Sequence, residues 1–341
     1  MISVTAYPHF VAGQTLSQKL SDYMKNKVEN QDFSGSVAVY WKGEPVIVAG
    51  YGAANRELSV PNSSKTVFRI GSVTKQFTSM AIMILQERGK LHVADPIGKH
   101  LDSIPAVWGK LTIHQLLTHT SGIMHSWALK GFGETMAVPT TLDATLARYY
   151  DKPLLFEPGT KHQYSGVGHF TLAKIIEVVS GEKYHDFLQK EIFDPLGMKS
   201  SGGDRPDAIL MHRADGYNRN NIGIFNAAYI YMPVLTGGGD LYSTIEDLVV
   251  WSHALNEGRL ISRSSYEMMY RPARNNYSYG WSVAHQNGHN VYSHSGSVPG
   301  FNAHLLRIPD FHFCAIILSN VAPTPVRKMA QEIVQLIFGD E

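Results

Sequence analysis

Strand-like segments stand at both ends of this chain, and helical patterns fill the middle. Near the N-terminus, "GSVAVYWKG" and "PVIVAGYG" are joined by a short turn at 42–44, which predicts a hairpin. Toward the C-terminus, "GFNAHLLRIPD" and "FHFCAIILSN" predict another pair, and Asn287-Gly288 indicates a second tight turn. We therefore expect an α/β fold of the α+β type, in which both ends of the chain build one antiparallel sheet.

Two terminal helices are expected to cover this sheet. Apolar residues recur at helical spacing over 15–30, and the closing stretch "PVRKMAQEIVQLIFG" places Val326, Met329, Ile333 and Ile337 on one face. Between about 95 and 260, helical patterns alternate with connections rich in proline and glycine. This organisation predicts a discontinuous sheet domain, 1–94 with 261–341, and a helical insertion domain, 95–260.

Three internal helices have clear sequence signals. A crowded apolar run predicts a buried helix from about Ser72 to Arg88, and a second helix is expected over 168–180. Ser243 and Glu246 have the spacing of a capping box, which predicts a third helix that begins there and ends near Gly258.

Composition excludes several classes of function. The net charge is +1 with sixteen histidines counted as neutral, and no run of Lys or Arg suggests a nucleic-acid partner. No apolar run approaches the roughly 18 residues of a membrane span. The lone cysteine, Cys314, permits no internal disulfide and lies in an apolar run, where we expect a buried thiol.

The expected compartment follows from the same features. The first fifteen residues carry no basic segment followed by a continuous apolar segment. A chain without disulfides fits a reducing environment. We expect a cytoplasmic protein, or a periplasmic or extracellular one if a signal peptide has been removed.

The stretch "FRIGSVTKQFTS" contains a serine three positions before a lysine, Ser72 and Lys75. At a helix start this spacing places both side chains on one face, with the serine at the positive end of the helix dipole. An amine beside a hydroxyl in a partly desolvated site can act as its base. A second such pair, Ser180 and Lys183, is interrupted by Gly181. Spacing alone leaves a catalytic role and a capping or surface role open for Ser72.

Other signatures of catalysis are missing from the sequence. No H-E-x-x-H motif indicates a zinc site, "TGGGDLYS" lacks the lysine and spacing of a phosphate-binding loop, and no serine lies in G-x-S-x-G. We expect neither a metal nor a cofactor. Tyr164, before a predicted helix, and His294, at the end of a predicted strand, are each unremarkable when taken alone.

Taken together and in order, these stretches resemble the class C β-lactamase and penicillin-binding-protein (DD-peptidase) group of serine hydrolases, which includes β-lactamase-like carboxylesterases. The matching motifs are "SVTK", "YSG" at 164–166 and "HSG" at 294–296. The less catalytic stretches "LTIHQLLTHTSGI", "FEPGT", "IFDPLGMKSS" and "GGGDLYSTIEDL" match as well. The resemblance covers the chain from about residue 15 to the end. It implies a sheet with an inserted helical domain, and one cleft at their junction where the three motifs meet.

The resemblance also implies roles for individual residues. Ser72 would form an acyl-enzyme, with Lys75 accepting or relaying its proton. Tyr164 would shuttle protons, and would ionise more easily than a free tyrosine if His294 were charged. His294 would also hold Tyr164 or a substrate carboxylate. The backbone N–H groups of Ser72 and Ser297 would form the oxyanion hole. The remaining residues expected at the substrate are Gly166, Ser295 and Gly296.

Two departures from the family pattern bear on the substrate. Gly166 stands where the family usually has an asparagine whose amide bonds the substrate's acylamide group. A polar contact worth on the order of 1 kcal/mol is then missing, unless Gln163 or another residue replaces it. Penicillins and acyl-D-Ala-D-Ala should lose recognition, whereas simple esters should not. The histidine of "HSG" replaces a lysine, and we expect it to make the charge of the site pH-dependent near neutrality.

The predicted function is therefore hydrolysis of small carboxylic esters or amides, with an ester, an amide or a β-lactam as the small-molecule substrate. Three further enzyme activities remain as alternatives: DD-peptidase, D-amino-acid peptidase and class C-type β-lactamase. A different class of function is a penicillin-recognising binding protein that acylates weakly.

Overall fold

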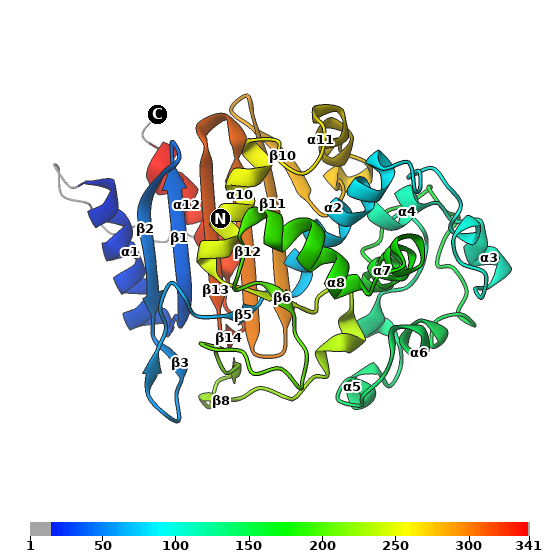
Figure 1. Ribbon diagram of the computed structural model, residues 1–341. Coiled ribbons are helices and arrows are strands. Elements are labelled where there is room, and N and C mark those ends of the chain that lie inside the picture. The colour runs from blue at the N-terminus through cyan, green and yellow to red at the C-terminus, as the bar shows by residue number, and fades with distance from the viewer. Residues whose placement is uncertain (1–14, 340–341) are drawn as a thin grey trace, which may run out of the picture.

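A computed structural model describes residues 15–339, and its centre is a six-stranded antiparallel sheet of order β10-β11-β12-β13-β1-β2 (Figure 1). The N-terminal hairpin lies directly beside the C-terminal strands, since β1 pairs with β13 from Gly35↔Ser319 to Tyr40↔Cys314. This confirms the predicted sheet shared by both ends. Its strands are β1 (Gly35–Trp41), β2 (Glu44–Tyr51), β10 (Ser282–Gln286), β11 (His289–Val298), β12 (Phe301–Ile308) and β13 (Phe313–Ser319).

The remaining strands are short and form three small sheets. In one of these, β5-β9-β6, strand β5 pairs with β9. This pairing holds the segment before Ser72 beside residues 242–243. The short strands are β3 (Ala53–Asn55), β4 (Val60–Pro61), β5 (Phe68–Arg69), β6 (Gly202–Gly203), β7 (Tyr217–Arg219), β8 (Ile224–Asn226), β9 (Leu241–Ser243) and β14 (Val321–Ala322).

Most of the helices lie between β5 and β10 in sequence and gather at one side of the sheet (Figure 1). The α-helices of the described residues are α1 (Leu16–Gln31), α2 (Thr74–Glu87), α3 (Ala106–Gly109), α4 (Ile113–Leu117), α5 (Phe132–Thr135), α6 (Leu142–Ala147), α7 (Gly166–Ser180), α8 (Tyr184–Leu188), α9 (Asp194–Leu196), α10 (Ile245–Asn256), α11 (Arg263–Tyr270) and α12 (Val326–Phe338). Shorter helical turns are η1 (Gly71–Val73), η2 (Ile97–Lys99), η3 (Ser126–Ala128), η4 (Gln189–Phe193), η5 (Met232–Leu235), η6 (Arg274–Asn276) and η7 (Pro309–Phe311).

The inner strands β1, β12 and β13 are buried on both faces of the central sheet, since successive side chains point to opposite sides and both sides are covered. On one face, Val37 and Ile317 pack with Leu20 of α1 and Ile333 of α12, which confirms the two terminal covering helices. On the other face, alternate residues such as Ala38 join the larger core formed with α2, α7 and α10. Helix α2, which begins just after Ser72, is therefore buried between the sheet and the helical region.

The predicted start of α10 needs a correction. The helix begins at Ile245 and its N-cap is Thr244, whose Oγ1 accepts a hydrogen bond from the backbone N–H of Asp247 at 3.1 Å. Ser243 instead pairs with Phe68 across β9 and β5, and its hydroxyl contacts that of Ser201 at 2.7 Å. Because Ser243 belongs to strand β9, the N-cap is the next residue, Thr244.

Removing this cap gives a test of the fold. We expect Thr244→Val, which keeps the side-chain shape but loses the acceptor, to lower the free energy of unfolding by about 1 kcal/mol. Thr244→Ser keeps the acceptor and should stay within about 0.5 kcal/mol of the wild type. Urea unfolding followed by circular dichroism measures both values. Equal stability of the two variants would contradict this assignment of the cap.

Cys314 is buried as predicted, and its burial raises the pKa of the thiol to about 11. Among residues 15–339, no helix is both long and apolar enough to cross a bilayer. Residues 1–14 lie outside the described residues. They belong to the predicted sheet domain and to the N-terminal segment from which the compartment was predicted. The domain boundaries at 94/95 and 260/261 stay predictions.

Candidate active site

Ser72 lies in the tight turn η1, directly before α2, and Lys75 lies in the first turn of that helix. The Nζ atom of Lys75 is 3.1 Å from the Oγ atom of Ser72. The turn is anchored by the backbone, because the N–H of Ile70 donates to the carbonyl of Leu241. The short spacing noted in the sequence thus becomes a direct contact between a hydroxyl and an amine.

The amine of Lys75 is enclosed, since the residue is only 1% exposed. Its Nζ donates to the carbonyl oxygen of Gly238 at 2.5 Å and lies 4.8 Å from the centre of the Tyr164 ring. Burial lowers the pKa of Lys75 to about 7, and the opposing charge of Asp240 reduces this shift. A substantial fraction of the amine is therefore neutral at neutral pH and able to accept a proton.

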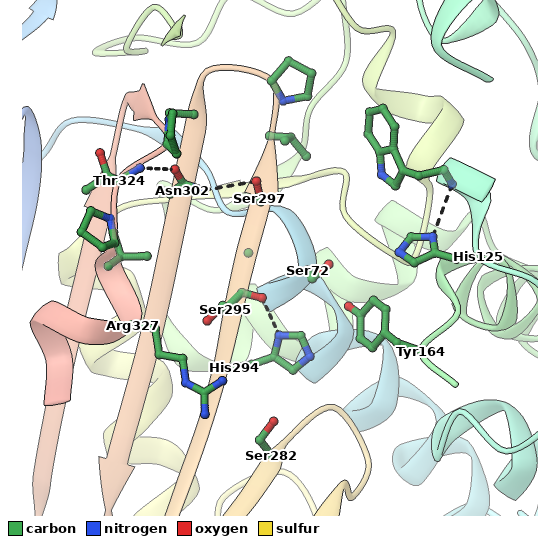
Figure 2. A pocket seen from close by; sticks show the side chains of 18 of the residues that line it. Ser72, His125, Tyr164, Ser282, His294, Ser295, Ser297, Asn302, Thr324 and Arg327 are labelled. Atoms are coloured by element: carbon green, nitrogen blue, oxygen red, sulfur yellow. Dashed lines mark hydrogen bonds between the residues drawn. The ribbon is translucent and has the colours of Figure 1, made fainter. Parts of the chain in front are cut away.

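Tyr164 is held over Ser72 by the start of α7. The N-cap of that helix is Ser165, and Figure 2 shows the hydroxyl groups of Tyr164 and Ser72 turned toward each other. The segment around Tyr164 is clamped by His119, whose carbonyl accepts from the N–H of Gln163 at 2.9 Å. The Nδ1 atom of the same histidine accepts from the N–H of Ser165 at 3.2 Å. The His119 ring lies against the Tyr164 ring, with 4.3 Å between centroids.

The ionisation expected for Tyr164 is not supported. Burial raises the pKa of its phenol, and the nearby hydroxyl of Ser72 opposes this only in part. The phenol oxygen is buried, and no residue within 15–339 makes a hydrogen bond of ordinary geometry to it. In the free protein Tyr164 is therefore a protonated group and a potential proton donor.

The two expectations for His294 also need correction. Burial, together with the charge of Lys75, lowers the pKa of His294 to about 3, so this imidazole is neutral and does not titrate near pH 7. Its Nδ1 atom is 2.7 Å from the carbonyl of Ser295, and its Nε2 atom is 2.9 Å from the hydroxyl of Tyr277. Its hydrogen-bond partner is thus Tyr277 rather than Tyr164, and it brings no positive charge to the site.

Strand β11 approaches the turn of Ser72 very closely, at a point where only glycine fits. The pairing of β10 with β11 ends at Ser282↔Ser293, which leaves the following residues of β11 beside η1. A Cβ atom on Gly296 would lie 1.9 Å from the carbonyl oxygen of Ile70 and 3.0 Å from the nitrogen of Ser72. The backbone nitrogens of Ser72 and Ser297 both border this contact, since a Cβ on Gly71 would lie 2.6 Å from the nitrogen of Ser297.

The predicted residues gather around one cleft of about 1200 Å³. Its wall includes Ser72, Tyr164, His294, Gly296 and Ser297. Ser295 lines it as well, and its Oγ is 2.8 Å from Nδ1 of His304. Lys75 lies beneath the surface of the cleft.

Gly166, a predicted substrate-binding residue, also lies outside the cleft wall. It is buried as the first residue of α7, where a Cβ would meet Ser126 Oγ at 3.3 Å and His125 Cε1 at 3.5 Å. His125 lines the cleft in its place.

Several residues around the site were not identified from the sequence: His119, His125, Tyr277, the carbonyl of Gly238 and Asp240. His119 and His125 sit in or next to "LTIHQLLTHTSGI", and Gly238 and Asp240 sit in "GGGDLYSTIEDL". The resemblance included both stretches as less catalytic parts of the family pattern. That resemblance was the one sequence signal that could have pointed to these residues. Within residues 15–339, no three His, Cys, Asp or Glu side chains are placed to hold a metal ion.

Comparison with known proteins agrees with this geometry. The family described as beta-lactamase matches residues 19–337, nearly the whole chain. The chain belongs to the beta-lactamase family. The paired Ser72 and Lys75 identify this beta-lactamase-family protein as a serine hydrolase.

Two relatives illustrate which proteins this beta-lactamase-family protein is similar to. It is 32% identical over 287 residues to PbpX of Bacillus subtilis, which is named as a penicillin-binding protein, and the match covers 84% of this chain and 69% of PbpX. It is 26% identical over 259 residues to a teichoic acid D-alanine hydrolase of Staphylococcus aureus, covering 75% of this chain and 59% of that protein.

A solved structure confirms the expected fold. The octameric penicillin-binding protein homologue from Pyrococcus abyssi superposes with a TM-score of 0.83 at 29% identity, over 94% of this chain and 77% of that one. The sheet, its terminal helices and the position of the helical region are therefore those of a β-lactamase-like fold.

Proposed function

We propose that this protein hydrolyses small carboxylic esters through an acyl-enzyme on Ser72. The observation that carries the proposal is the 3.1 Å contact between Ser72 Oγ and Lys75 Nζ at the cleft, with an amine whose pKa burial lowers to about 7. A nucleophile needs a neighbouring base that is unprotonated at working pH, and Lys75 meets both conditions.

Acylation proceeds in three proton transfers. Neutral Lys75 takes the hydroxyl proton of Ser72 as Oγ attacks the ester carbonyl, and the negative oxygen that forms accepts from the N–H groups of Ser72 and Ser297. The bond to the leaving oxygen then breaks. Protonated Tyr164 donates its proton to that oxygen and recovers one from the Lys75 ammonium, 4.8 Å from its ring centre, so both residues return to their starting states.

Deacylation repeats these steps with water as the nucleophile. The amine of Lys75 takes a proton from a water molecule that attacks the acyl carbonyl, with relay through Tyr164. The Ser72 oxygen leaves and is reprotonated by Lys75. His294 contributes as a neutral group that fixes Tyr277 at one side of the cleft, with 2.9 Å between His294 Nε2 and the Tyr277 hydroxyl.

The preference for esters rests on Gly166. This residue has no side chain to bond an acylamide group, and it lies buried beneath Ser126 and His125. A substrate that depends on an amide at this place loses a contact worth on the order of 1 kcal/mol, whereas a simple ester loses nothing. Penicillins and acyl-D-Ala-D-Ala peptides are therefore the poorer substrates in this proposal.

A panel of three substrates tests this preference. We expect kcat/KM for p-nitrophenyl butyrate to exceed the values for a chromogenic cephalosporin and for an acyl-D-Ala-D-Ala peptide. The measurement compares initial rates of the three under one set of conditions. If the cephalosporin or the peptide is turned over a hundredfold faster than the ester, the substrate preference is wrong, while the mechanism at Ser72 is unaffected.

A second candidate is favoured by one relative. The S. aureus protein is named for hydrolysis of D-alanine on teichoic acid, although this chain spans only 59% of its length. The candidate substrate here is then a D-alanyl ester. D-alanine released from D-alanyl esters at a higher kcat/KM than butyrate from its p-nitrophenyl ester would favour this candidate.

A further inference from the structure

His125 forms part of the cleft wall on the side opposite strand β11 (Figure 2). Its ring centre is 5.4 Å from that of Tyr164, and a Cβ atom on Gly166 would lie 3.5 Å from its Cε1 atom. A substrate group that reaches this part of the cleft therefore meets the imidazole of His125 rather than Gly166.

The orientation of the imidazole is fixed by the turn that follows it. His125 is the N-cap of η3, where its Nδ1 atom accepts from the backbone N–H of Trp127 at 3.4 Å and lies 3.1 Å from Ser126 Oγ. Figure 2 shows this capping bond. The ring cannot turn over without losing the cap, since only Nδ1 reaches that N–H.

The His125 ring carries its proton on Nε2, the nitrogen that takes no part in the cap. Burial, with the charge of Lys75, lowers the pKa of His125 to about 4, so the imidazole is neutral at pH 7. A neutral imidazole whose Nδ1 is an acceptor carries its hydrogen on Nε2. No group within residues 15–339 hydrogen-bonds to Nε2, whose position in the cleft wall leaves it available to a substrate.

We propose that His125 is a specificity-determining residue, whose Nε2–H group donates a hydrogen bond to an acceptor on the acyl part of the substrate. The preferred ester then carries a carbonyl or ether oxygen near its acyl carbon, and not only a hydrocarbon chain. This inference rests on the proposed hydrolysis at Ser72. It assigns to His125 a donor for that oxygen alone. The N–H of an acylamide still finds no side-chain acceptor at Gly166, so penicillins and acyl-D-Ala-D-Ala peptides stay the poorer substrates.

Two esters of matched shape test the proposal: the p-nitrophenyl esters of N-acetylglycine and of 4-methylpentanoic acid. The second replaces the N–H by CH2 and the carbonyl by CH–CH3, and both release the same alcohol. We call the kcat/KM of the N-acetylglycine ester divided by that of the 4-methylpentanoic ester the substrate ratio. The substrate ratio of a variant divided by that of the wild type cancels the intrinsic reactivities of the two esters. It reports only contacts with the acyl part.

Two variants separate the donor from the cap. Asparagine can reproduce the Nδ1 acceptor of histidine but does not reach to Nε2, whereas the longer glutamine places an N–H near Nε2. We expect His125→Asn to lower the substrate ratio about five- to tenfold, because one hydrogen bond is lost. We expect His125→Gln to keep the ratio within about twofold of the wild type. Thermal unfolding of both variants checks that the fold is intact.

The outcomes are distinguishable from failure of the proposed function. An unchanged ratio in His125→Asn, in an enzyme whose turnover still requires Ser72, overturns the role of His125 alone. Equal losses on both substrates, or a ratio that His125→Gln fails to keep, assign His125 to structure rather than to specificity. Turnover that persists in Ser72→Ala overturns the proposed function itself.

Discussion

Replacing Ser72 with alanine is expected to lower kcat/KM for p-nitrophenyl butyrate by roughly a thousandfold or more. The change removes the only atom of this residue that can form the acyl bond, and leaves the turn η1 and helix α2 otherwise unaltered. Initial rates of p-nitrophenol release measure the loss. A residual rate above that of hydrolysis in buffer is consistent with the remaining oxyanion-hole donors.

The chain supplies its own control for this experiment. Ser180 also stands three positions before a lysine, but its Oγ donates to the carbonyl of Ile176, and the helix ends at Gly181 in a left-handed conformation. Ser180→Ala should therefore leave turnover within about twofold of the wild type. A fluorophosphonate probe should label Ser72 in the wild type and in Ser180→Ala. A label on another residue, or undiminished turnover in Ser72→Ala, would exclude the mechanism.

The difference between these two serines shows what the sequence could predict. The central sheet and its covering helices followed from hydrophobic periodicity, because Val37 and Ile317 alternate with residues of the opposite face, and Met329 and Ile333 recur at helical spacing. Such patterns involve residues close together in the chain, so they can be read directly from the sequence. The contact of Lys75 with Ser72 was predictable as a possibility only, until the other motifs made the family resemblance specific.

Contacts between distant segments could not be predicted from periodicity. The carbonyl of Gly238 reaches Lys75 across 163 positions of the chain, and His119 holds the segment around Tyr164 across more than forty. Nothing in the spacing of these residues indicates the contact. The same holds for His125, which lies beside Gly166 only because η3 and the start of α7 come together.

Protonation states were the least predictable property of the site. The sequence shows which side chains can carry a charge, but burial decides whether they do. His294 was expected to titrate near neutrality, yet its enclosure beside Lys75 lowers its pKa to about 3. Tyr164 was expected to ionise more easily than a free tyrosine if His294 were charged, yet His294 is neutral and burial raises the pKa of the phenol. Both corrections shift the role of base toward Lys75.

If Lys75 is the base, kcat/KM for p-nitrophenyl butyrate should rise about tenfold per pH unit below pH 7 and level off above it. The sign follows from the protonation state, because only the neutral amine accepts the proton of Ser72, and its fraction grows as pH rises through a pKa of about 7. The neighbouring imidazoles His294 and His125 have pKa values of about 3 and 4, so their titration falls well below this range. Rates read at the isosbestic wavelength of p-nitrophenol, after subtraction of the buffer reaction, give the profile.

Two substitutions connect this profile to the amine. Lys75→Met should lower kcat/KM by about 10²- to 10⁴-fold and remove the rise around pH 7, whereas the equivalent change at the second pair, Lys183→Met, should alter neither. Asp240→Asn removes the charge that raises the pKa of Lys75, so the rise should move to lower pH. A rise that persists in Lys75→Met, or that moves to higher pH in Asp240→Asn, would assign the base to a group other than this lysine. Since burial outweighs Asp240 in setting the pKa of Lys75, the enclosure of the amine by Gly238 and Tyr164 keeps a large fraction of it neutral at neutral pH and so able to accept the proton of Ser72.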